Sequence, residues 1–289
     1  MPELPEVEVV RAGLAPALVG ATIDHVDIYD HRSLKRHDGR RGDFVYLLTG
    51  AKVLSAQRRG KFMWFPLDRG DALIVHLGMS GQVLLREQGD TSDKHLRIHA
   101  SITHPDQGDF SVNFVDQRIF GSMAIDELRE QRFGATTVMV PSQAAHIALD
   151  PLDDLFDDAA FVKRLRSRRI GVKKALLDQT LISGVGNIYA DEALWAASIH
   201  YEKPSDQLSA QAARRLLTEV RQVLVKALAE GGTSFDAQYV NVNGQSGYFS
   251  HSLNAYGQQG MPCPRCGRNI VKEKFMNRHS HLCPKCQKR

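Results

Sequence analysis

All four cysteines of this chain lie within its last 27 residues, in two pairs separated by sixteen residues: Cys263-Pro-Arg-Cys266 and Cys283-Pro-Lys-Cys286. Two pairs with this spacing are typical of a tetrahedral zinc site, whereas two disulfides or buried free thiols are the competing interpretations. The chain shows no charged-then-apolar leader and no run of about 18 apolar residues. We therefore expect a cytoplasmic protein, in which reducing conditions favour zinc over disulfides. Because four thiolates leave no open position, we predict one structural zinc ion per chain.

The formal charge of +4 is distributed unevenly along the 289 residues. Residues 261–289 contain eight Lys or Arg and one acid, and residues 163–174 contain seven Lys or Arg and no acid. Each segment contributes +7, which leaves the remainder of the chain at −10. Such concentration indicates a surface that follows a phosphate backbone, and the alternative is two ordinary solvated faces.

The first half of the chain predicts a helix followed by many short strands. Residues 5–18 combine an early proline, acids in the first turn and apolar residues at helical spacing. From 21 to 138, short β-type runs alternate with turn residues, which favours a sandwich or barrel. The expected strands are 22–28, 44–48, 61–65, 72–76, 82–85, 98–103 and 110–114. Prolines near both ends of 140–151 mark an interdomain linker.

Helical patterns dominate the second half, over 159–168, 173–181, 190–198 and 209–230, the last closed by Gly231-Gly232. Between the second and third of these helices, residues 182–189 form a glycine-rich turn of helix-turn-helix type. Its glycines would let backbone amides approach a phosphate, although an ordinary packing turn explains them equally simply. Residues 235–260 read as a mobile lid or as a plain connector.

Four motifs occur together and in order. They are the opening Met-Pro-Glu-Leu-Pro-Glu-Val-Glu, the segment 76–81 (HLGMSG), the segment 184–190 (GVGNIYA) and the four-cysteine ribbon. This combination closely resembles the formamidopyrimidine-DNA glycosylase family, bacterial repair enzymes that remove 8-oxoguanine and ring-opened purines. The resemblance implies an α+β fold with four parts: an N-terminal β-sandwich with its helix (1–138), a hinge (139–152), a helix-two-turn-helix domain with a lesion-capping loop (153–259) and a zinc finger (260–289).

The resemblance also implies a bifunctional glycosylase and abasic-site lyase that works through β,δ-elimination. Its nucleophile would be Pro2, which becomes an N-terminal secondary amine once Met1 is removed. An α-amino group has a pKa near 7.8, against about 10.4 for lysine, so far more of it is neutral and nucleophilic at pH 7. Glu3 matches the general acid and base, while Lys61 and Arg278 match the cations that contact the lesion and its phosphates.

A base within a duplex must be flipped out before an amine can attack its sugar, and the vacancy must be filled. Met79, Arg118 and Phe120 match the family's wedge, in which the arginine hydrogen-bonds the widowed cytosine. Further DNA contacts implied by the resemblance are His76, His95, Arg168, Lys173, Asn187 and Tyr256. Glu6 belongs to the opening motif, but helix stabilisation explains it first. The expected partner is damaged double-stranded DNA, with no membrane, and the expected state is a monomer.

The chain departs from the family pattern at Gln117 and Ile119, where proline and a second arginine are common, so the wedge loop could be set differently. Residues 239–249 fit the loop that covers a flipped purine. Leu4 favours the purine-directed branch over the endonuclease VIII type, which prefers oxidised pyrimidines. A zinc-containing DNA-binding protein without catalysis is the remaining alternative, and it would have no need of Pro2, Glu3 or Lys61.

Overall fold

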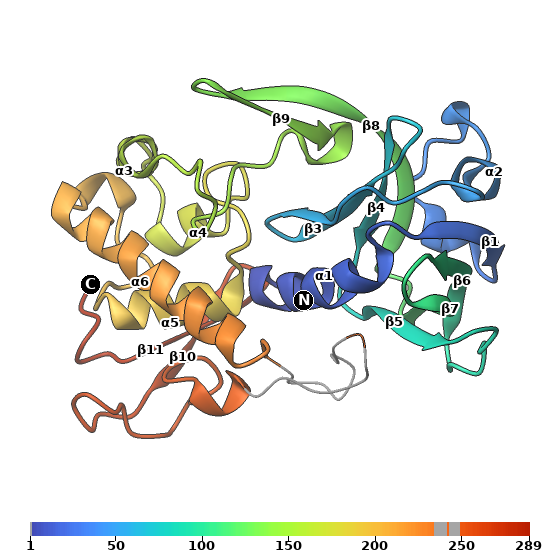
Figure 1. Cartoon of the computed structure of the whole chain (residues 1–289). Coiled ribbons are helices and arrows are strands. Elements are labelled where there is room, and N and C mark those ends of the chain that lie inside the picture. The colour runs from blue at the N-terminus through green and yellow to red at the C-terminus, as the bar shows by residue number, and fades with distance from the viewer. Residues whose placement is uncertain (1, 234–241, 243–248) are drawn as a thin grey trace. The chain divides into compact units, whose positions relative to one another are not determined.

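The computed structural model describes residues 2–233, 242 and 249–289, which form two compact units (Figure 1). The first unit comprises 2–146, 231–233 and Val242, and the second comprises 147–230 and 249–289. The first unit is mainly sheet and the second mainly helix, so the predicted α+β class is confirmed. Of the predicted covering loop, residues 239–241 and 243–248 lie outside the described residues.

Helix α1 (Leu4–Leu18) begins at a capping box formed by Glu3 and Glu6. The Glu3 backbone N–H donates to Glu6 Oε2 at 2.8 Å, which satisfies a donor that the first helical turn would otherwise leave open. The other oxygen, Glu6 Oε1, accepts from the Thr233 backbone N–H at 2.8 Å and from its hydroxyl at 2.9 Å. Glu6 is only 8% exposed, and it has the structural role predicted for it.

Two antiparallel sheets build the first unit. One has the order β1 (Thr22–Ile28), β6 (Leu96–His104), β7 (Gly108–Asp116), β5 (Gly81–Glu87); the other has the order β2 (Gln57–Arg59), β3 (Phe62–Pro66), β4 (Asp71–His76), β8 (Ser122–Phe133), β9 (Thr136–Pro141). A single apolar core joins α1 to both sheets, with Leu14, Ile23, Phe65, Val75 and Phe114 among its members. The predicted β-sandwich therefore forms because the inner faces of both sheets are buried against each other.

Two expectations for this unit were wrong or incomplete. Residues expected as a strand form helix α2 (Phe44–Leu48), because the Asp43 carboxylate caps it by accepting from the Tyr46 N–H at 2.9 Å. Phe44 and Leu48, one helical turn apart, are both buried. Strands β8 and β9 were not predicted, and β9 extends to Pro141, within the segment assigned to the linker. Short 3-10 turns occupy His31–Leu34 (η1), Gly39–Arg41 (η2) and Ser142–Ala144 (η3).

The second unit contains α3 (Asp158–Arg166), α4 (Val172–Leu176), α5 (Asn187–Ala196), α6 (Ala210–Ala229), the turns η4 (Ser205–Gln207) and η5 (Phe249–Ser252), and the hairpin of β10 (Val271–Phe275) and β11 (Arg278–Leu282). Helix α4 is shorter than predicted, since Asp178 accepts from the Thr180 N–H at 2.9 Å and turns the chain. Gly231 and Gly232 have φ of 75° and 81°, as the predicted helix end requires. None of the described helices has the length and apolar character needed to span a membrane.

Candidate active site and nucleic-acid interface

In the first unit, the chain's opening residues and the turn that carries Lys61 are tied to the same helix. Pro2 and Glu3 are buried at the start of α1, and Lys61 follows Gly60, whose φ is 56°, in the tight turn between β2 and β3. Glu8 of α1 accepts from Arg58 Nε of β2 at 2.9 Å. The structure thus joins segments that lie about fifty residues apart in the sequence.

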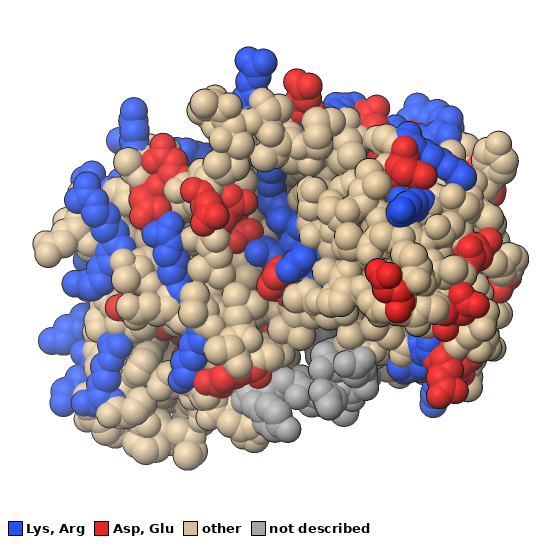
Figure 2. Space-filling view, viewed as in Figure 1, with Lys and Arg blue, Asp and Glu red and all other residues tan. Residues whose placement is uncertain are grey.

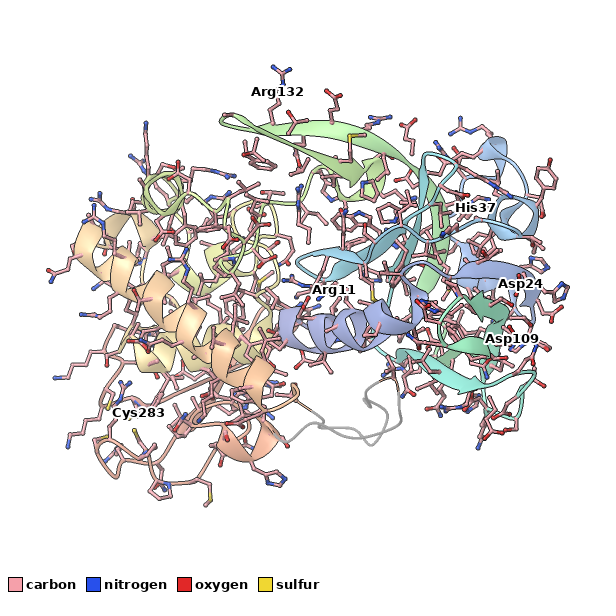
Figure 3. All side chains as sticks on the ribbon, viewed as in Figure 1. Arg11, Asp24, His37, Asp109, Arg132 and Cys283 are labelled. Atoms are coloured by element: carbon pink, nitrogen blue, oxygen red, sulfur yellow. The ribbon has the colours of Figure 1, made fainter. Side chains whose placement is uncertain are left out.

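Arg11, labelled in Figure 3, reinforces this connection. Its NH2 group donates to Glu8 Oε1 at 2.6 Å and its NH1 group to the Ala56 carbonyl at 3.1 Å. Burial by itself raises the pKa of Glu8, but the hydrogen bonds and charges of Arg11 and Arg58 outweigh it and leave that pKa below its usual value. Glu8 is therefore a carboxylate at neutral pH, and it holds the β2–β3 hairpin against α1.

A group of cations surrounds His76 at the end of β4. The His76 and Phe62 rings lie 4.7 Å apart between centroids, and the Arg36 guanidinium lies 5.3 Å from the Phe62 ring. Burial, followed by the charges of Arg36, Lys35 and Lys61, lowers the pKa of His76 to about 4, so the ring is neutral at pH 7. Sequence reasoning missed Lys35 and Arg36, whose only signal is a basic run interrupted by acids.

The predicted wedge residues come from two neighbouring loops of the first unit. Met79 and Phe120 are 41% and 43% exposed, unusual for large apolar side chains, and the Arg118 guanidinium lies 4.8 Å from the Phe120 ring. Gly78, with a φ of 63°, packs so closely that a Cβ there would be 2.3 Å from the Phe120 carbonyl carbon. The predicted DNA contact His95 adjoins this region, because its carbonyl accepts from the Asp116 N–H at 3.0 Å.

In the second unit, helix α5 anchors the four-cysteine ribbon. Asn187, its first residue, donates from Nδ2 to the His279 carbonyl at 3.2 Å. One turn later, Asp191 accepts from the His281 N–H at 2.9 Å and pairs with Lys173 Nζ at 2.6 Å. Lys173 also donates to the Ser280 hydroxyl at 2.7 Å and is fully buried. This burial does not support the predicted phosphate contact of Lys173, and it indicates a structural cross-link instead.

The other predicted contacts of this unit are Tyr256 and Arg168, which are half-buried, and Arg278, which is exposed. Glu192 of α5, only 2% exposed, orients the turn of Tyr256 by accepting from the Tyr256 N–H at 2.8 Å. The Tyr256 ring lies 4.8 Å from that of His281. Arg168 is engaged in an ion pair with Asp178, and Arg278 is exposed at the start of β11.

The basic segment 163–174 is only partly available to a ligand. The members that remain exposed are Lys163, Arg164, Arg166, Arg169 and Lys174. Figure 2 shows Lys and Arg side chains gathered over the α3 and α6 side of the second unit. The predicted basic surface is thus carried by five side chains of this segment rather than seven.

The four cysteines form a candidate metal centre, whose Cys283 is labelled in Figure 3. Their Sγ atoms all lie within 4.8 Å of one another, with Cys263–Cys286 at 4.0 Å and Cys266–Cys283 at 3.5 Å. A tetrahedron with metal–sulfur bonds of about 2.3 Å has edges of about 3.8 Å, so the cluster fits such a site. Trp195 Nε1 of α5 donates to Cys263 Sγ at 3.4 Å and joins the centre to the helix.

Three family models match the chain in succession. They are the formamidopyrimidine-DNA glycosylase N-terminal domain over residues 1–123, the H2TH domain of the same enzymes over 147–238, and the zinc finger found in FPG and IleRS over 260–289. A formamidopyrimidine-DNA glycosylase of Leifsonia xyli subsp. xyli is 60% identical, with both chains covered completely. One of Nocardioides sp. is 53% identical over 99% of this chain and 94% of the relative.

Solved structures give the same result. A Lactococcus lactis FPG mutant in complex with a Fapy-dG containing DNA has a TM-score of 0.84 and 31% identity, with both chains covered completely. MutM in complex with carbocyclic 8-oxo-G containing DNA has a TM-score of 0.83 at 31% identity, again over both full chains.

A β-sandwich, a helical H2TH domain and a four-cysteine finger together define a DNA glycosylase of repair. The chain belongs to the formamidopyrimidine-DNA glycosylase family. It is an enzyme of base excision repair, and the family predicted from its motifs is confirmed.

Proposed function

We propose that this chain excises oxidised purines from duplex DNA and then cleaves the strand, with Pro2 as the nucleophile. The observation that carries the proposal is the cross-link through Glu8, which fixes the Lys61 turn to the helix that Pro2 and Glu3 begin. A secondary amine that attacks C1′ of the damaged nucleoside displaces the base and yields an iminium ion. The iminium accepts electrons during elimination, so no metal is needed at the reacting carbon.

Glu3 supplies and removes protons in this scheme. Glu3 follows Pro2 directly and is only 2% exposed. Its side chain takes part in the capping box, which holds the carboxyl group at the N-terminal end of α1. Lys61 and Arg278 neutralise the phosphates that leave during β- and δ-elimination. Lys61 belongs to the cationic group around His76, and Arg278 is exposed on the ribbon hairpin, so both suit an anionic substrate.

Met79, Arg118 and Phe120 fill the stack when the lesion is flipped, and His76, His95, Arg168, Asn187 and Tyr256 position the backbone. The exposure of Met79, Arg118 and Phe120 supports the first role, and the cations beside the half-buried His76 suit contact with phosphate. Zinc in the cysteine cluster has a structural function, because the ribbon lacks an apolar core of its own apart from the small cluster around Trp195. The proposed partner is damaged duplex DNA, bound by a monomer in the bacterial cytoplasm.

Borohydride trapping on a duplex with 8-oxoguanine opposite cytosine tests the proposal. We expect a covalent adduct that maps to Pro2 and that Pro2→Gly reduces strongly. The control is Pro5→Ala, which changes the neighbouring proline and leaves the terminal amine intact. Tight binding without an adduct would support a non-catalytic protein, and trapping only on oxidised pyrimidines would support the endonuclease VIII type.

A further inference from the structure

The loop that carries Arg118 and Phe120 is built around the carboxylate of Asp116. Asp116 ends strand β7 and is fully buried. Its Oδ1 accepts from the backbone N–H of Arg118 at 3.1 Å and of Ile119 at 3.0 Å. Its Oδ2 accepts from the Gly121 N–H at 2.7 Å. One side chain therefore satisfies three backbone donors of a five-residue turn.

The same carboxylate reaches the second wedge loop. The hydroxyl of Ser80, the residue after Met79, donates to Asp116 Oδ1 at 2.5 Å, and Ser80 is 3% exposed. The same two loops also approach closely at Gly78 and Phe120. The loops of Met79 and Phe120 are thus joined by a buried, charge-assisted hydrogen bond, a strong type in an interior of low dielectric.

A cation also binds this loop. Lys35 Nζ donates to the carbonyls of Ile119 at 2.8 Å and of Phe120 at 3.0 Å. Ile119 has a φ of 55°, a left-handed conformation that is rare for a β-branched residue. Asp116 accepts from the Ile119 N–H and Lys35 donates to the Ile119 carbonyl, so hydrogen bonds on both sides of this residue hold its unfavourable backbone conformation.

We propose that Asp116 is a positioning residue for base flipping, which presets the wedge of Met79, Arg118 and Phe120 before DNA binds. A wedge that is already ordered loses little conformational entropy on insertion, and it meets the stack at a defined point. The inference rests on the proposed function, because it assumes that these three side chains fill the vacancy.

Asp116→Asn tests it, since an amide nitrogen cannot accept the hydrogen bonds of one carboxylate oxygen. The matched control is Asp109→Asn, an exposed carboxylate near the other end of β7 (Figure 3). Two single-turnover rates are measured: excision of 8-oxoguanine from a duplex, which needs the wedge, and cleavage at an abasic site in single-stranded DNA, which has no stack to fill. We expect Asp116→Asn to lower the first rate about 10- to 100-fold and the second no more than about twofold.

The fluorescence of 2-aminopurine placed beside the lesion gives an independent readout, because it rises when the neighbouring base is unstacked. This rise should be slowed in Asp116→Asn and unchanged in Asp109→Asn. An equal loss in both cleavage assays, or no loss in the duplex assay, would overturn the inference. Absence of both activities in the unchanged chain would overturn the proposed function, and the inference with it.

Asp116→Asn could fail to fold, which its thermal melting curve would reveal. In that case Lys35→Met and Ser80→Ala test the inference, because each removes one contact of the wedge loops and leaves the Asp116 carboxylate in place. Each should lower the ratio of the duplex rate to the single-strand rate at least about threefold, by the same misplacement of the wedge. Ratios equal to that of the unchanged chain in both variants would contradict the inference.

Discussion

At the scale of single residues, His76 shows how surroundings decide a charge. Burial and the neighbouring cations Arg36, Lys35 and Lys61 lower its pKa from 6.5 to about 4. The unfolded chain therefore binds a proton at a pH where the folded chain does not. The resulting stabilisation is complete above pH 6.5 and is lost as the pH falls toward 4. Because His76 is neutral, it does not add a positive charge that would repel the neighbouring cations.

This predicts a specific pH dependence for His76→Gln. Between pH 6.5 and 4 the free energy of unfolding should fall less steeply in this variant than in the unchanged chain, because glutamine takes up no proton. Urea titrations at several pH values measure the two slopes. His25→Gln, which changes an exposed histidine of β1, is the control. Parallel slopes for His76→Gln and the unchanged chain would contradict the pKa shift.

At the scale of elements, α5 is the part of the second unit on which the others depend. Its Asp191 pairs with the buried Lys173 of α4 and binds the His281 N–H of β11. Its Glu192 holds the turn of Tyr256, and burial raises the pKa of that carboxyl group. One helix thus fixes both the ribbon and a proposed DNA contact through buried polar groups, whose loss is costly.

Asp191→Asn should lower the free energy of unfolding of this unit by about 3–5 kcal/mol, because it leaves the Lys173 ammonium buried without a counter-charge. Adding Lys173→Met to that variant should recover part of the loss. The exposed pair of Arg169 and Asp206 supplies the control, since Asp206→Asn should cost less than about 1 kcal/mol. Chemical denaturation measures all of these values. Full stability of Asp191→Asn would argue that Lys173 is not a structural cross-link.

The ribbon predicts the effect of metal removal. A chelator should release one zinc ion per chain and disorder residues 260–289, because the described ribbon has few apolar contacts beyond Trp195, Ile270 and the cysteines. Binding to damaged duplex should weaken at least about tenfold as the exposed cations of the hairpin lose their placement. Metal analysis and a binding titration measure this, and added zinc should restore affinity. Unchanged binding by the metal-free chain would separate the ribbon from DNA recognition.

At the scale of the whole molecule, charge determines how the chain meets a polyanion. Two segments of net +7 lie in a chain whose remainder is −10. Within the first segment, Lys173 is buried against Asp191 and Arg168 forms an ion pair with Asp178. Attraction to phosphate therefore depends on the members of these two segments that stay exposed. Such a distribution orients the molecule on a duplex without reading its sequence.

If about four or more of these groups contact phosphates, the dissociation constant for duplex DNA should rise about 100-fold or more between 50 and 200 mM salt. Arg169→Gln and Lys174→Gln should each reduce the logarithmic slope by about one. Arg129→Gln, an exposed arginine of β8 in the first unit, is the control and should leave the slope unchanged. A flat response to salt would exclude the basic segments from the interface.

Much of this architecture could be predicted from the sequence, because hydrophobic periodicity and capping residues act locally. Helix α6 follows its pattern to within a residue at each end, between Ser209 and Gly231. The segment 44–48 failed, since its apolar residues suit a strand and only Asp43 identifies a helix start. Strands β8 and β9 were missed because long, partly exposed strands alternate weakly and are fixed mainly by pairing with each other and with β4.

By itself, the sequence determined the family, the sandwich, the helical domain and the four thiolates, because these depend on residue types at fixed spacing. Only the tertiary structure decided which charged side chains are buried and which distant residues they bind. It buried Lys173 against Asp191, placed Lys35 on the wedge carbonyls, and made Asp116 the common acceptor of two loops. These outcomes depend on burial and on contacts between residues far apart in the chain, and neither quantity is a property of any local segment.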